Sequence, residues 1–75
     1  MIDLNMVLAK SPAPHSGVII EQRIAPEGWV QLCMYVSNLA DLPDSKRQDM
    51  IVWAFDVCQR LTNGGTPTQF IILDE

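Results

Sequence analysis

The order of hydrophobic and polar positions divides the chain into four predicted strands and one predicted helix. The first predicted strand covers residues 2–9, where every second residue is a large apolar one: Ile2, Leu4, Met6 and Leu8. This alternation is typical of a strand with one buried face. Residues 10–17 then contain two prolines and a glycine. They predict an exposed loop, because proline lacks the N–H group that a central strand donates.

Two further alternating segments predict a β-hairpin. Residues 18–24 place Val18, Ile20 and Ile24 on one face, and residues 29–36 place Val30, Leu32, Met34 and Val36 on one face. Between them, Pro26 and Gly28 occupy positions that suit a type I turn, and a four-residue loop joins antiparallel strands. Leu32, Val36, Leu39 and Ala40 also have helical spacing, but the aromatic and β-branched residues of this segment favour the strand.

A helix is predicted to begin at residues 44–45 and to end at the glycine pair 64–65. Ser45 and Gln48 match a capping box, and glycine is typical just after a helix. One helix face carries the apolar stripe Met50, Ala54, Val57, Cys58 and Leu61. The last apolar run, residues 69–73, is continuous, which is typical of a strand covered on both faces.

This order, βββαβ, predicts a single α+β domain over residues 1–75, with a small antiparallel meander, a C-terminal strand and one helix packed on one face. A helix of about 17 residues is about 25 Å long and covers one face of four strands. The other face of the meander is therefore expected to meet solvent or a partner.

The residues that remain outside the predicted core form a candidate partner-binding set. The uncovered sheet face is predicted to carry Cys33 together with the candidates Ile19, Arg23, Trp29, Gln31 and Tyr35. The helix adds Trp53 at its apolar margin and Val52 on its polar side. Tryptophan, tyrosine and arginine are enriched at interface hot spots. Single exposed apolar residues are ordinary, but their grouping on one face favours an interface.

Composition narrows the class of protein. Hydrophobic residues make up 48% of the chain and charged residues 19%, with a net charge of −4. The chain is too apolar for disorder, has no apolar run that spans a membrane, and shows no signal peptide, so a cytoplasmic protein is expected. Because basic residues are few, no direct binding of nucleic acid is expected. Asp41, Asp44 and Asp49 form a candidate acidic patch, although charge complementarity with a helix N-terminus also explains them.

The chain contains no motif that carries catalysis or metal binding. His15 is the single histidine, and it lies in the proline-containing loop. Cys33 and Cys58 lack the close spacing of zinc ligands, and their predicted faces separate them too far for a disulfide. The glycine pair follows a helix, whereas phosphate-binding glycines precede one. No enzyme activity, metal or cofactor is expected, and a thiol- or histidine-dependent subunit would have to use Cys33 or His15.

These features predict a small acidic binding protein that acts through protein–protein contacts. Its size, charge and architecture are analogous to those of phage and mobile-element antagonists, including anti-CRISPR proteins, although no motif carries that analogy. The partner would then be a larger nucleic-acid-handling complex with basic surfaces. The alternative is a self-associating module, a homodimer formed through the uncovered face or an unpaired edge strand.

Overall fold

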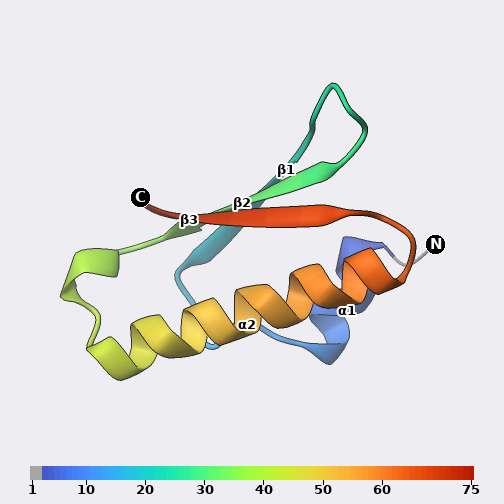
Figure 1. Ribbon diagram of the computed structural model, residues 1–75. Coiled ribbons are helices and arrows are strands. Elements are labelled where there is room, and N and C mark those ends of the chain that lie inside the picture. The colour runs from blue at the N-terminus through green and yellow to red at the C-terminus, as the bar shows by residue number, and fades with distance from the viewer. Residues whose placement is uncertain (1–2) are drawn as a thin grey trace.

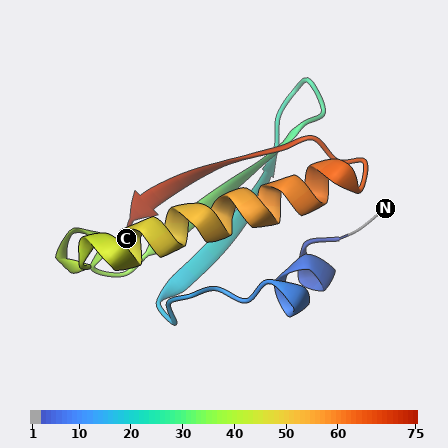
Figure 2. The ribbon, with the colours of Figure 1, turned by 60° about the horizontal axis from the view of Figure 1, so that its bottom comes forward.

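The computed structural model describes residues 3–75, which form two helices and a three-stranded sheet (Figure 1). In chain order the elements are α1 (Leu4–Lys10), β1 (Val18–Ile24), β2 (Val30–Val36), a short 3-10 helix η1 (Leu39–Asp41), α2 (Asp44–Asn63) and β3 (Thr68–Asp74). Both helices lie on the same side of the sheet (Figures 1 and 2). The predicted α+β class is confirmed.

The sheet is mixed, with the strand order β1-β2-β3. β1 and β2 form the predicted hairpin and pair antiparallel, whereas β2 and β3 pair parallel. A parallel pair needs a long crossover, and α2 supplies it. β2 is therefore the central strand, and β1 and β3 are the two edges of the sheet.

The predicted first strand is wrong, because residues 4–10 form the helix α1. Asp3 begins this helix, and its side chain accepts a hydrogen bond from the Met6 N–H at 2.9 Å. Leu4, Val7 and Leu8 have helical spacing, and all three contact the core. Leu4 and Leu8 satisfy both a period of two and a helical period, so alternation alone did not distinguish the two structures. Ile2, the first residue of that predicted alternation, lies outside the described residues.

Two local predictions about α2 and β3 are also wrong. α2 begins after Pro43, and no side chain caps its first turn, so Ser45 and Gln48 do not form a capping box. β3 is covered on one face only, since Ile71 is 41% exposed. Both helices pack on the same side of the sheet, so no layer covers the other face of β3.

The core lies between the sheet and the helices. The even-numbered residues of β2 are its centre, and α2 meets them with Met50, Trp53, Ala54, Val57, Cys58 and Leu61. This is the predicted apolar stripe with one addition, Trp53, which is only 6% exposed. The prediction that Trp53, at the apolar margin of the helix, is left outside the core is therefore wrong.

Trp53 joins α2 to the end of α1. Its indole Nε1 donates a hydrogen bond of 2.7 Å to the carbonyl oxygen of Ser11, the residue that ends α1. The Ser11 hydroxyl in turn donates to the Asp56 carboxylate at 2.6 Å. This hydrogen bond and the one from Arg60 lower the pKa of Asp56. A helix as short as α1 is marginal on its own, so these contacts and the buried Val7 hold it in place.

Candidate interaction surface

The odd-numbered residues of the three strands make up the sheet face that the helices leave uncovered. Successive side chains of a strand point to opposite faces, and the even-numbered positions lie on the helix side, where those of β2, with Val18, Ile20, Phe70 and Ile72, form or pack against the core. The pairing register arranges the odd positions in three rows across β1, β2 and β3: Ile19–Tyr35–Leu73, Glu21–Cys33–Ile71 and Arg23–Gln31–Gln69. We call these nine residues the open face.

The open face changes from apolar to polar along the strands. Its first row is apolar, with Ile19 57% exposed and Tyr35 and Leu73 half-buried. Its last row is polar, and there the Arg23 guanidinium forms an ion pair with Glu21. Hydrogen bonding to Glu21 is the main reason why the pKa of Arg23 is raised. An apolar patch with a polar border is the pattern of a contact surface.

Cys33 lies in the middle of the open face and is nevertheless only 2% exposed. It does not belong to the core cluster on the helix side of the sheet. Cys58 does, so the two thiols lie on opposite faces, and both are free. Burial raises the pKa of Cys58 to about 11. Because the thiolate is the reactive form, burial makes Cys58 a poor nucleophile.

The structure divides the predicted partner-binding set. Four of its members lie together on the open face: Ile19, Arg23, Gln31 and Tyr35. Trp29 is half-buried and immediately precedes β2, at an odd-numbered position. Val52 is exposed but belongs to α2, which packs on the other face of the sheet. Trp53 belongs to the core.

Sequence analysis missed Ile71 and Leu73, which complete the apolar part of the open face from β3. The continuous apolar run of residues 69–73 hid their alternation with Phe70 and Ile72, which pack against the core. Only the parallel pairing of β3 with β2 brings Leu73 beside Tyr35.

Exposed carboxylates lie at the end of β3 and along η1 and the first turns of α2. Asp74 and Glu75 follow Leu73 directly, and Glu75 accepts a hydrogen bond of 2.7 Å from the Ser37 hydroxyl. The Asp74 carboxylate accepts a hydrogen bond of 3.4 Å from the N–H of Leu39, the first residue of η1. Asp41, Asp44 and Asp49 follow in η1 and α2; all three are exposed, and Asp44 forms an ion pair with Arg47.

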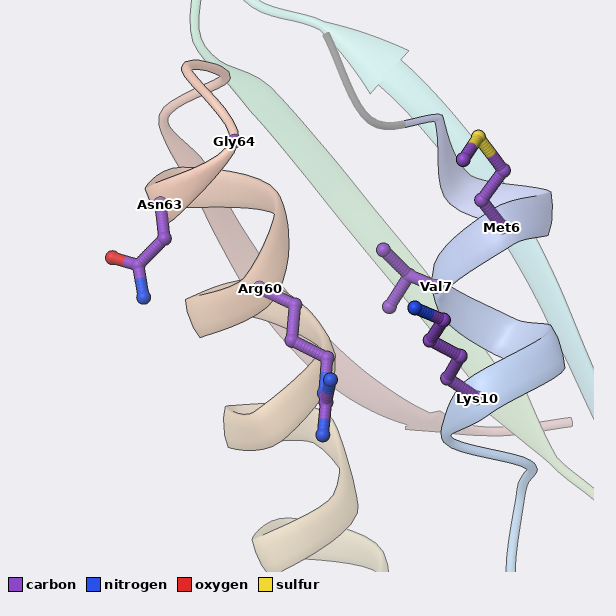
Figure 3. A pocket seen from close by; sticks show the side chains of 6 residues that line it. All are labelled: Met6, Val7, Lys10, Arg60, Asn63 and Gly64. Atoms are coloured by element: carbon purple, nitrogen blue, oxygen red, sulfur yellow. The ribbon is translucent and has the colours of Figure 1, made fainter.

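A cavity of about 280 Å³ separates α1 from the end of α2 (Figure 3). Its lining consists of Met6, Val7, Lys10, Arg60, Asn63 and Gly64. Figure 3 shows Arg60 reaching towards α1 and Lys10 reaching towards α2. Each cation lies in the last turn of its helix, where it offsets the negative end of the helix dipole. Arg60 is also paired with Asp56 at 3.0 Å, so stabilisation of the two helices explains both cations.

A second apolar surface lies where α2 meets β3. Phe55 and Phe70 pack edge to face with ring centroids 5.2 Å apart, yet Phe55 is 63% exposed. A cavity of about 190 Å³ lies further along the same side of α2, lined by Leu39, Arg47, Met50, Ile51 and Ile72. This surface borders the outer edge of β3 and is separate from the open face.

His15 and Cys33 are the residues that a thiol- or histidine-dependent activity would use. His15 is half-buried in its loop, next to Gly17, and neither His15 nor Cys33 lines the two cavities described above. Within residues 3–75, no group of three histidine, cysteine or acidic side chains has the arrangement of a metal site.

Comparisons with protein-family models, with curated proteins and with solved structures found no match to this chain. In the part of the chain that the structure describes, no helix has the length and apolar character that crossing a membrane requires.

Proposed function

We propose that this chain is a non-enzymatic binding protein that docks a protein partner on the open face. The observation that carries the proposal is the position of both helices on one side of the sheet, which leaves an apolar row without cover. That row combines Ile19 and Tyr35 with Leu73, and Ile71 lies beside it. A tyrosine flanked by aliphatic side chains is typical of interface centres.

Charge supports a basic partner. Glu75 adjoins the apolar row, where its carboxylate accepts a hydrogen bond from the Ser37 hydroxyl, and the whole chain carries a net charge of −4. A partner with lysine and arginine around an apolar patch would match both the row and its acidic border, and such complementarity speeds association. That the partner belongs to a nucleic-acid-handling complex, as for phage antagonists, stays a prediction from size and charge.

Parallel affinity capture from host extract tests the proposal. The baits are the wild-type chain, Ile19→Ser, Tyr35→Ala and Val52→Ser, and captured proteins are identified by mass spectrometry. Val52 is the matched control, because it is 59% exposed and Ile19 is 57% exposed. Val52 lies on α2, away from the open face. We expect a basic protein that the wild type and Val52→Ser retain and the two open-face variants lose.

The affinity of the purified protein for its partner then gives the magnitude of the loss of binding in each variant. Truncation of a hot-spot tyrosine costs about 2 kcal/mol or more, which weakens binding about 30-fold. Salt should slow association, since the charged border contributes mainly to the association rate. A partner that binds Tyr35→Ala as tightly as the wild type would contradict the assignment of the open face.

A further inference from the structure

The outer edge of β1 presents unpaired backbone groups. The hydrogen bonds from the Ser37 N–H to the Gly17 carbonyl and from the Ala25 N–H to the Trp29 carbonyl show that odd-numbered residues on this side of the hairpin face β2. In an antiparallel ladder the even-numbered residues then point their N–H and C=O groups outward. Among residues 3–75, no hydrogen bond outside the β1–β2 ladder reaches Val18, Ile20, Gln22 or Ile24.

The charges of β1 select one way for this edge to pair with itself. Antiparallel pairing of two copies joins outward-facing even positions, so the two-fold axis passes through Glu21, Gln22 or Arg23, or further from the centre of the strand. An axis at Glu21 or at Arg23 sets like charges directly opposite each other, which is destabilising. An axis at Gln22 sets Glu21 opposite Arg23 of the second copy, and Arg23 opposite its Glu21.

We propose that two copies of this chain pair β1 against β1, antiparallel and centred on Gln22, to form one continuous six-stranded sheet. The Glu21–Arg23 pair within each strand then becomes part of a ring of four alternating charges. Gln22 meets Gln22 of the second copy in a pair that exchanges both backbone hydrogen bonds.

The same register covers the most exposed large hydrophobic side chain described for the protein. Ile24 is 77% exposed, and pairing centred on Gln22 places it opposite Ile20 of the second copy. Pro26 follows the strand and lacks an N–H group, so the new ladder ends beside it. Opposed residues of an antiparallel pair point to the same side, so the two open faces become one surface of twice the area.

The charges of β3, the other edge strand, favour no register for pairing with a second copy. The Thr68 N–H already donates to Thr62 at 3.2 Å, and the charges at the end of β3, on Asp74 and Glu75, are all negative. Two copies of β3 therefore gain no oppositely charged pair in any register. Charge complementarity thus favours β1 as the self-pairing edge.

Charge reversal tests both the interface and its register. Sedimentation equilibrium should show wild-type chain with twice the monomer mass of 8.4 kDa. Arg23→Glu and Glu21→Arg each set like charges opposite one another, so we expect each to weaken self-association about ten-fold or more. The double variant Glu21→Arg/Arg23→Glu restores opposite charges and should restore the dimer. Both positions are exposed. Circular dichroism is used to check that each variant is folded.

A cysteine on the proposed axis provides a second readout. Hydrogen-bonded antiparallel pairs have Cα atoms about 5.5 Å apart, which suits a disulfide. Gln22→Cys should therefore form a disulfide-linked dimer under mild oxidation, whereas Glu27→Cys, exposed on the hairpin turn, should not. The native thiols of Cys33 and Cys58 are buried and should not react.

Two results would overturn the proposal. One is a monomer at concentrations of several hundred micromolar. The other is a dimer that Arg23→Glu leaves intact, which would place the contact on the Phe55 surface or on the apolar row of the open face. The partner-binding function fails separately, because Tyr35→Ala tests it and Tyr35 lies on the central strand, away from the paired edges.

Discussion

Replacing Trp53 by phenylalanine should release α1 from the rest of the fold. The phenyl ring keeps most of the packing of the indole but cannot donate to the Ser11 carbonyl, which the indole Nε1 reaches at 2.7 Å. A hydrogen bond of this kind contributes about 0.5–1.5 kcal/mol to stability. The void that the smaller ring leaves adds a small further cost. We expect a loss of about 1–2 kcal/mol in the free energy of unfolding.

That loss is large for a chain of 75 residues, whose total stability is about 4–11 kcal/mol at typical values per residue. Urea unfolding gives the free energy, and the thermal midpoint should fall by about 4–16 °C. Trp29→Phe is the matched control, because Trp29 is half-buried, lies outside the core cluster and donates no side-chain hydrogen bond within residues 3–75. Its effect should stay within about 0.5 kcal/mol.

Amide hydrogen exchange separates release of α1 from general weakening of the core. In Trp53→Phe the amides of Val7 and Ser11, which bond to the carbonyls of Asp3 and Val7, should exchange faster relative to those in the middle of α2. Ser11→Ala removes the hydrogen bond to Asp56 and should act on the same helix. The double variant should therefore lose less than the sum of the single losses. Uniformly faster exchange along the chain would refute this account and leave Trp53 as a packing residue alone.

Four further predictions concern stability. Ala54→Asp places an unpaired charge in the core and should unfold the domain, which circular dichroism detects. Asp3→Ala removes the hydrogen bond to the Met6 N–H and should cost about 1 kcal/mol in urea unfolding. The folded pKa of Asp56 lies below its ordinary value of 3.8, so its contribution is complete above pH 3.8 and is lost as the pH falls through the folded pKa; Asp56→Asn should flatten the acid side of the stability profile. The folded pKa of Cys58 is about 11 against an ordinary 9.0, so stability should decline as the pH rises from 9 to 11, and Cys58→Ala should remove that decline.

Sequence alone determined the hairpin of β1 and β2 and the apolar stripe of α2. The hairpin of β1 and β2 was predicted from alternation around Pro26 and Gly28, and Gly28 indeed has a positive φ of 91°. The apolar stripe of α2 was predicted because five of its positions repeat at helical spacing over several turns. Long periodic segments are predicted well, because turning such a segment to its other face would expose all of its apolar side chains.

Only the tertiary structure decided α1, the position of β3 and the extent of the open face. Leu4 and Leu8 fit a strand as well as a helix, and the helix is held by the contacts that Trp53 and Asp56 make with Ser11, more than 40 residues away in sequence. Ile71 and Leu73 joined the candidate surface because β3 pairs parallel with β2 while both helices occupy the opposite face. Such contacts depend on which segments meet in space, and local periodicity carries no information about that.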